Sequence, residues 1–124
     1  MKDEITFKEI HYPNGQLSHK NQFLNDEKHG EQLGYYESGK LHYKSYYING
    51  KQHGEQLGYY ENGELYYKYQ FLNDKPHGEQ LEYFKNGKLW SETCYINDKK
   101  VSKEEWLDYS KPQHDTQFLT DLYV

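Results

Sequence analysis

The sequence predicts an all-β fold, a single-layer antiparallel β-meander of about eight strands with a short C-terminal helical cap. Three observations predict it: the chain repeats with a 24-residue period, turn dipeptides recur about every twelve residues, and tyrosine replaces much of the usual aliphatic mass. Because a tyrosine ring can be buried while its hydroxyl stays in water, this composition suits a thin sheet better than a compact globule.

Composition and charge narrow the classes of partner. The 124 residues suit one domain, hydrophobic residues make up only 34%, and aromatic residues reach 18% because there are 15 Tyr. The net charge is −5 and the lysines form no run, which argues against nucleic acid and against an anionic membrane surface. The same charge mildly favours a basic protein partner.

Cysteine content and the chain start point to an intracellular protein. One cysteine, Cys94, allows no intramolecular disulfide and no four-cysteine metal site. The N-terminal stretch MKDEITFKEI lacks the apolar run of a signal peptide, and no segment approaches the roughly 20 apolar residues of a membrane span. We therefore expect a cytoplasmic protein.

Four consecutive segments of 24 residues align with one another, and the first three contain HGEQL unchanged. The segments begin at Tyr12, Tyr36, Tyr60 and Phe84. We therefore divide the chain into an N-terminal edge strand over 1–11, repeats over 12–101 and a C-terminal helical cap over 102–124.

Each repeat holds two turn signals about half a period apart. The first set is Asn14-Gly15, Ser38-Gly39, Asn62-Gly63 and Asn86-Gly87; the second is Asn25-Asp26, Asn49-Gly50, Asn73-Asp74 and Asn97-Asp98. Such dipeptides favour two-residue type I′ hairpins, whose central positions both need positive φ. The predicted antiparallel strands cover residues 5–12, 17–24, 29–36, 41–48, 53–60, 65–72, 77–84 and 89–96.

Counting outward from two-residue turns predicts the cross-strand pairs. Opposite charges meet at Lys20 with Glu31, Lys44 with Glu55, Lys68 with Glu79, and Glu92 with Lys103. A tyrosine ring can cover a bare glycine at Gly34 with Tyr43 and at Gly58 with Tyr67. In the fourth repeat this pair becomes Glu82 with Ser91, so the aromatic cover is lost there.

Strict alternation sorts the strand residues into two faces. One face is uncharged apart from Glu82 and carries Leu17, Phe23, Tyr36, Leu41, Tyr43, Tyr47, Tyr60, Leu65, Tyr67, Tyr69, Phe71, Phe84, Leu89 and Tyr95. The other, wetter face carries the Lys–Glu pairs with His29, His53, His77, Leu33, Tyr35, Tyr46, Leu57, Tyr59, Tyr66, Leu81, Tyr83 and Trp90.

The C-terminal segment changes character. The sequence from Ser102 to Glu105 matches a capping box and predicts a short helix that ends before Pro112. Asp115 is then expected to cap a further helical turn or two. We expect the apolar stripe of that segment to fold over the end of the uncharged face; the stripe comprises Phe118, Leu119, Leu122 and Tyr123.

The pattern YYENGEL…NDKPHG, repeated over about residues 12–101, resembles the MORN-repeat-variant family, and VSKEEW at 101–106 is similar to the ending that such proteins often have. The resemblance implies a single-layer β-meander that serves as a binding surface, with no shared active site. Many bacterial members are similar to the YwqK-type antitoxins, proposed to neutralise a toxin; other MORN proteins are linked to scaffolding, dimerisation or lipid association. The fourth repeat departs from the pattern, with VSKEEW in place of HGEQL.

Repeated side chains argue against a chemical site. His29, His53 and His77 lie on every second strand, so neighbours are about 9–10 Å apart, whereas each ligand of a zinc ion lies about 2.1 Å from it. We expect a structural His-Gly element, no metal and no cofactor. Cys94 is expected to be a small half-buried residue rather than a nucleophile. Since catalysis needs one unique constellation and this chain duplicates nearly everything, we expect no catalytic residues and no enzyme.

The aromatic face is the predicted binding surface. It can also be read as only the core of a curled sheet. Eight strands are too wide for one short helix to cover, however, and an uncovered aromatic patch normally marks an interface. The candidate partner-binding residues are Tyr36, Tyr43, Tyr47, Tyr60, Tyr67, Tyr69 and Phe71.

These observations predict a non-catalytic protein-binding module, an antitoxin, immunity protein or similar inhibitor whose partner is a basic toxin or effector. A phage-encoded inhibitor of a host defence protein would have the same features. The alternative of another class is a self-associating scaffold, a homo-oligomer built through sheet edges or the uncharged face. Lipid association is disfavoured because the net charge is wrong for anionic headgroups.

Overall fold

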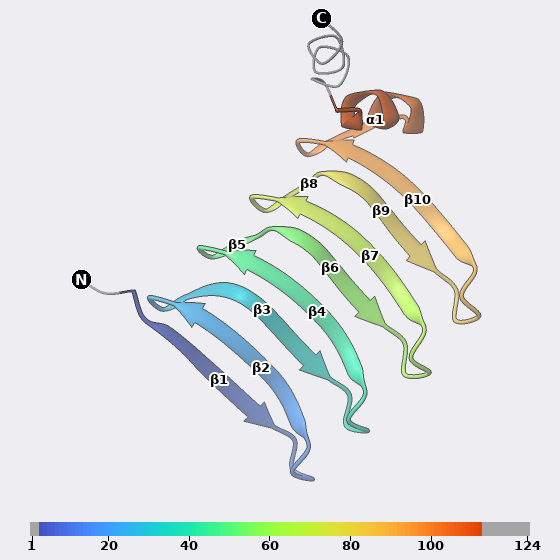
Figure 1. Ribbon diagram of the computed structural model, residues 1–124. Helices are drawn as coiled ribbons and strands as arrows, with labels where there is room; N and C mark the ends of the chain where they lie inside the picture. Colours follow the sequence, from blue (N-terminus) through green and yellow to red (C-terminus); the bar gives the residue numbers. More distant parts are fainter. Residues whose placement is uncertain (1–2, 113–124) are drawn as a thin grey trace, which may run out of the picture.

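A computed structural model of the protein describes residues 3–112. In this part of the chain the strands lie side by side in one antiparallel sheet, a single curved layer (Figure 1). Neighbouring strands in the sheet are consecutive in the sequence, which confirms the predicted meander. Helix α1 (Lys103–Ser110) lies at the C-terminal end beside the last long strand.

Every predicted strand is present. The strands are β1 (Ile5–His11), β2 (Leu17–Leu24), β3 (Glu27–Tyr35), β4 (Leu41–Ile48), β5 (Lys51–Gln52), β6 (Gly54–Tyr59), β7 (Leu65–Leu72), β8 (Lys75–Pro76), β9 (Gly78–Tyr83), β10 (Leu89–Ile96) and β11 (Lys99–Val101). The short pieces β5 and β8 precede the predicted strands 53–60 and 77–84, from which they are separated at His53 and His77. Strand β11 was not predicted; it pairs with β10 just before the helix.

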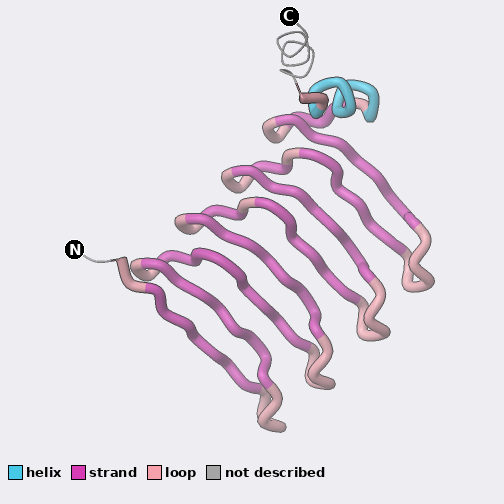
Figure 2. Tube along the Cα trace, in the orientation of Figure 1, coloured by secondary structure: helices cyan, strands magenta, loops and turns pink. Residues whose placement is uncertain are grey.

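The two sets of turn dipeptides form different turns at opposite ends of the strands (Figure 2). At Asn25-Asp26 and its three equivalents both residues have positive φ, as a type I′ turn requires. At Asn14-Gly15 only the glycine does, and its N–H donates to the carbonyl of Tyr12, which makes a three-residue loop. The predicted two-residue turn is therefore wrong at Asn14-Gly15 and its equivalents. Pro13 fits this loop because its fixed φ suits the first central position of a type I turn.

Each of the first three type I′ hairpins contains a bulge a few residues from its turn. Leu24 pairs with Glu27 as predicted, but beyond the bulge Lys20 lies opposite Leu33 and not opposite Glu31. The glycine of the His-Gly element explains the shift, because Gly30 has a φ of +88° and the segment around it adds two residues to one strand.

The same shift moves the later lysines. Lys44 lies opposite Leu57, and Lys68 lies opposite Leu81. The predicted pairs of Lys20 with Glu31, Lys44 with Glu55 and Lys68 with Glu79 are therefore wrong.

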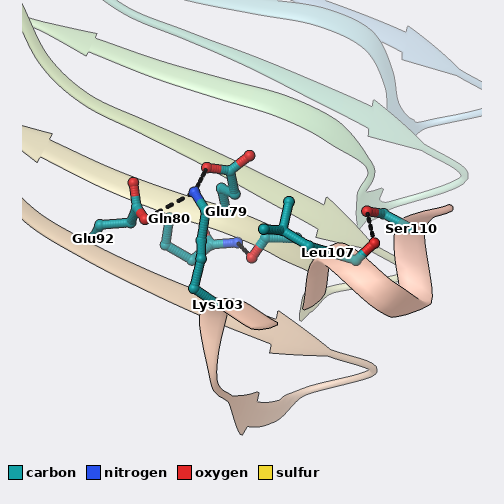
Figure 3. A network of polar contacts seen from close by, with 7 residues as sticks. Glu79, Gln80, Glu92, Lys103, Leu107 and Ser110 are labelled. Atoms are coloured by element: carbon teal, nitrogen blue, oxygen red, sulfur yellow. Dashed lines mark hydrogen bonds and ion pairs between the residues drawn. The ribbon is translucent and has the colours of Figure 1, made fainter. Parts of the chain in front are cut away.

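The lysines instead form ion pairs with glutamates of the preceding strand. Lys44 Nζ lies 3.2 Å from Glu31 Oε2, and Lys68 Nζ lies 3.3 Å from Glu55 Oε2. The fourth predicted pair is confirmed: Lys103 Nζ lies 2.9 Å from Glu92 Oε1, and it also lies 2.8 Å from Glu79 Oε2 (Figure 3). These side chains are partly exposed, so each pair contributes at most about 1 kcal/mol to stability.

The predicted glycine–tyrosine pairs are confirmed. Gly34 lies opposite Tyr43 and Gly58 opposite Tyr67. A Cβ atom added to either glycine would collide with the facing ring, so each ring lies directly on bare backbone. The pair of Glu82 with Ser91 is also confirmed.

Three buried side chains of the sheet are glutamines of the HGEQL motif. Gln32 and Gln56 are 2% exposed and Gln80 is 9% exposed. The side-chain amide of Gln56 donates to the carbonyl of Tyr46 at 3.0 Å and accepts from the Tyr46 N–H at 3.1 Å. Because the bulge removes the regular strand partner of Tyr46, the Gln56 amide takes the place of a peptide group. Gln80 forms the same two hydrogen bonds with the backbone of Gln70.

Helix α1 begins with the predicted capping box. Ser102 Oγ accepts from the Glu105 N–H at 3.0 Å, and Glu105 Oε1 accepts from the Ser102 N–H at 3.2 Å. The predicted second helical segment, with Asp115 and the stripe of Phe118, Leu119, Leu122 and Tyr123, lies outside the described residues. Within residues 3–112 no helix is long and apolar enough to cross a membrane.

Candidate functional site

One face of the sheet carries rows of aromatic rings over small or flat neighbours. On β4, β7 and β10 the aromatic residues lie opposite glycine or glutamine in six of the cross-strand pairs. The pairs are Tyr43 with Gly34, Tyr47 with Gly30, Tyr67 with Gly58, Tyr69 with Gln56, Phe71 with Gly54 and Tyr95 with Gly78. We call this surface, formed by Tyr43, Tyr47, Tyr67, Tyr69, Phe71 and Tyr95, the tyrosine face.

Five of the predicted partner-binding residues lie on the tyrosine face: Tyr43, Tyr47, Tyr67, Tyr69 and Phe71. The rings of Tyr67 and Tyr69 stack there, with centroids 4.5 Å apart. The register thus brings the strand tyrosines of successive repeats together on one surface.

The other two predicted residues, Tyr36 and Tyr60, lie at the three-residue loops. Tyr36 stacks on His42 with centroids 4.2 Å apart, and Tyr60 stacks on Tyr66 at 4.6 Å. Strict alternation predicts that Tyr60 and Tyr66 lie on opposite faces. That assignment is wrong because the register shifts at the end of the strand, between Gly58 and Tyr59.

The hydroxyls of these loop tyrosines join successive repeats. Tyr36 donates to the carbonyl of Tyr59 at 2.7 Å, and Tyr60 donates to the carbonyl of Tyr83 at 2.8 Å. Tyr36 and Tyr60 therefore have a structural role that sequence reasoning missed, although their 24-residue spacing was visible.

Three hydroxyls of the tyrosine face, those of Tyr43, Tyr67 and Tyr69, are held in the neutral form. Burial raises the pKa of Tyr43, Tyr67 and Tyr69 above the ordinary value of 10.0. For Tyr69 the second cause is the hydrogen bond that its hydroxyl donates to Glu82 Oε1 at 3.0 Å. These three residues therefore offer rings and uncharged hydroxyls to a partner.

Glu82 was predicted to be the only strand charge on this face, and that prediction is wrong. Cross-strand partners share a face, and Lys28 pairs with Phe23, Lys8 with Asn21 and Lys100 with Tyr95. Lys28 also lies over the ring of Tyr47, with its Nζ 5.2 Å from the centroid. The prediction missed Lys28 because β3 begins two residues before the expected start of that strand.

The tyrosine face is hollowed beside Glu82. Glu82 and Ser91 form the cross-strand pair that corresponds to Gly58 and Tyr67 in the preceding repeat. Beside Glu82 lies a cavity of about 250 Å³. It is lined by Tyr69, Phe71, Pro76, Gln80, Glu82, Thr93 and Tyr95.

Two of the three repeated histidines accept a hydrogen bond from the backbone, whereas the buried Nδ1 of His53 has no hydrogen-bond partner within the described residues. His29 Nδ1 accepts from the N–H of Asn49 at 3.1 Å, and His77 Nδ1 accepts from the N–H of Asn97 at 3.0 Å. These bonds tie the His-Gly elements at His29 and His77 to the next type I′ turn, in agreement with the structural interpretation. The described part of the chain holds no group of three His, Cys, Asp or Glu residues that could bind a metal ion.

Cys94 is more deeply buried than predicted, at 3% exposed. Burial raises the pKa of its thiol, which disfavours the thiolate form that a nucleophile requires.

Helix α1 contacts the face opposite the tyrosine face. Its first residue, Lys103, pairs with Glu79 and Glu92, and Trp106 and Tyr109 pack edge-on against His77. We call this opposite surface the charged face. Within residues 3–112 the tyrosine face therefore remains open.

A family model described as the MORN repeat variant matches three consecutive stretches, residues 28–49, 52–73 and 76–97. Together these stretches span more than half of the 124 residues. Each begins just before a His-Gly element and ends within a type I′ turn, so the family unit coincides with one structural repeat. No curated protein and no solved structure matches the chain.

Proposed function

Because the chain belongs to the MORN-repeat-variant family, we propose that it is a non-catalytic module that holds a partner protein on its tyrosine face. The observation that carries the proposal is the open row of half-buried rings on β4, β7 and β10. Tyrosine rings give rigid, amphipathic contact area at a low cost in conformational entropy. An uncovered aromatic patch of this kind normally marks an interface.

The size of the sheet fits a protein partner. The main path of nine strands, spaced about 4.8 Å apart, is about 38 Å wide, and an eight-residue strand is about 26 Å long. One face therefore offers on the order of 1,000 Å², whereas a standard interface buries about 800 Å² per partner.

We further propose that binding inhibits the partner, as in an antitoxin of the YwqK type, an immunity protein or a phage-encoded inhibitor of a host defence protein. The net charge of −5 favours a basic toxin or effector as partner. A face this broad would act by covering the partner's functional surface.

The binding surface is tested with two variants, each of which adds one negative charge to one face of the sheet. Ser45 lies opposite Gln32 on the tyrosine face, so Ser45→Glu adds charge and bulk without removing a ring that covers glycine. Tyr46→Glu adds the same charge on the charged face, where Tyr46 is 44% exposed. From native cell lysate we expect tagged wild type and Tyr46→Glu to retain the same stoichiometric partner, and Ser45→Glu to retain at least about tenfold less.

Quantitative mass spectrometry and size-exclusion chromatography measure the capture, and the activity of the purified partner should fall as the chain is added. Thermal unfolding of all three proteins provides the folding control. Undiminished capture by Ser45→Glu would show that the partner binds elsewhere. A partner that stays fully active in a stoichiometric complex would refute inhibition.

A second candidate function is a scaffold that self-associates through β1. All seven residues of this edge strand are exposed, and Ile5, Phe7 and Ile10 are 57%, 59% and 46% exposed. An edge strand with unpaired backbone groups and apolar side chains readily pairs with another strand. Because α1 follows the strand at the other edge, pairing of β1 with β1 would give a closed dimer.

Light scattering over a concentration series tests the scaffold. A dimer would give twice the chain mass of 15.0 kDa, and Phe7→Lys should return it to a monomer. A mass that stays at one chain throughout the series would eliminate this candidate.

A further inference from the structure

The hollow beside Glu82 lies where the repeat differs at two paired positions. In the two preceding repeats a ring lies on a glycine, at Gly34 with Tyr43 and at Gly58 with Tyr67. In the following repeat the glycine position holds Glu82 and the tyrosine position holds Ser91. The changes replace a ring on bare backbone by a carboxylate beside open space of about 250 Å³.

The walls of the hollow combine rings with one oriented carboxylate. Tyr69 and Phe71 come from β7, and Tyr95 comes from β10. The Tyr69 hydroxyl donates to Glu82 Oε1 at 3.0 Å, which fixes the carboxylate at the side of the hollow. Aromatic faces and a carboxylate attract the same kind of guest, a cation.

Glu82 lacks the lysine partner that four other strand glutamates have. Glu31, Glu55, Glu79 and Glu92 all form ion pairs with lysine. Among residues 3–112 no lysine or histidine forms an ion pair with Glu82.

Lys85 lies three residues beyond Glu82 in the chain, but its Nζ lies over the ring of Tyr60, 5.9 Å from the centroid, and forms no ion pair with Glu82. Lys100 shares the face, but it lies beside Tyr95, whose partner on β9 is Gly78. Glu82 is four residues further along β9, which corresponds to about 13 Å. The sequence from 113 to 124 contains neither Lys nor Arg.

We propose that this hollow binds an arginine side chain of the protein partner, an inference that rests on the proposed function. A guanidinium group fits better than an ammonium group because it is planar, stacks on rings and forms two parallel hydrogen bonds with a carboxylate. The volume is below the roughly 300–1,000 Å³ of small-molecule sites, which suits a single side chain. The net charge of −5 favours the approach of a basic partner.

The site is tested without the partner, by NMR titration of the ¹⁵N-labelled full chain with N-acetyl-arginine amide. We expect saturable, millimolar binding that shifts the amide signals of Tyr69, Gln80 and Glu82. N-acetyl-citrulline amide, which has the same shape but no charge, should bind at least about tenfold more weakly. Glu82→Gln should weaken arginine binding by a similar factor. Glu55→Gln removes the same charge from the charged face and should leave binding within about twofold of wild type.

A second variant tests whether a loss of arginine binding could result from misfolding. Glu82→Gly combined with Ser91→Tyr restores the pair present at Gly58 and Tyr67, so this protein should unfold at the same or a higher temperature while its hollow is filled. We expect it to lose arginine binding. Absence of saturable shifts in wild type, or unchanged binding in both Glu82 variants, would overturn the arginine site. Those results would leave the effect of Ser45→Glu on partner capture intact, so the two proposals fail separately.

Discussion

Replacing Gly58 with alanine is expected to destabilise the sheet by about 2–3 kcal/mol, as overpacking of a tight contact does. The added Cβ would come 2.5 Å from Cζ and 2.6 Å from Cδ2 of Tyr67, closer than real contacts allow. Tyr67 has little room to move because its ring stacks on Tyr69 at 4.5 Å and meets the edge of Tyr66 at 5.7 Å. Urea denaturation measures the change in free energy of unfolding.

The control is the same substitution in a Tyr67→Ala background. Without the ring, Gly58→Ala should be neutral or should stabilise by about 0.5–1 kcal/mol, because alanine loses less backbone entropy than glycine in a strand. This double-mutant cycle isolates the contact between ring and backbone. An equal loss in both backgrounds would show that the Tyr67 ring is not the reason for a glycine at this position.

Replacing Gln56 with leucine is expected to destabilise the protein by about 2–3 kcal/mol, because the part-buried N–H of Tyr46 loses its acceptor and faces an apolar side chain instead. The substitution removes both hydrogen bonds that Gln56 forms with the Tyr46 backbone, while it keeps a side chain of similar size. Urea denaturation measures the loss, and hydrogen exchange at the Tyr46 amide should accelerate.

The comparison variant is Gln32→Leu. Gln32 is as deeply buried, and it donates to the carbonyl of Gln22 at 2.7 Å, but its Oε1 has no hydrogen-bond partner within the described residues. Its replacement frees no buried N–H group, so the loss should be about 1 kcal/mol smaller. Equal losses for the two variants would contradict the role of the Gln56 amide as a substitute peptide group.

Most residues of the candidate site were predicted from the sequence, but the extent of the tyrosine face and the cavity in it were not. The positions of Tyr43 and Tyr67 were predicted correctly. Beyond the register shift at each three-residue loop, the strands pair as they would across a two-residue turn, so counting from the loop gives the right partners. Tyr36 and Tyr60 were misplaced because the register shifts at the strand end itself. The lost ring at Ser91 was predicted, whereas the cavity beside Glu82 depends on the side chains of four strands, β7, β8, β9 and β10.

The sequence by itself determined the features that depend on local or periodic signals. The meander followed from turn dipeptides at regular spacing, and the start of α1 followed from the capping box at Ser102 and Glu105. The pairs of glycine with tyrosine followed from counting within one hairpin. Each of these needs only residues that are close in the chain or related by the repeat.

Only the tertiary structure decided the features that depend on a bulge, where two paired strands have unequal numbers of residues. The bulge at the His-Gly element forms because Gly30 and its equivalents adopt positive φ. It is also stabilised because side-chain amides such as that of Gln56 form hydrogen bonds with the backbone N–H and carbonyl groups that the bulge leaves without strand partners. That bulge moves each lysine two residues along its partner strand, which pairs Lys44 with Glu31 instead of Glu55. The physical reason is that a bulge is stabilised jointly by backbone conformation and by hydrogen bonds from the neighbouring strand, and counting along one chain records neither.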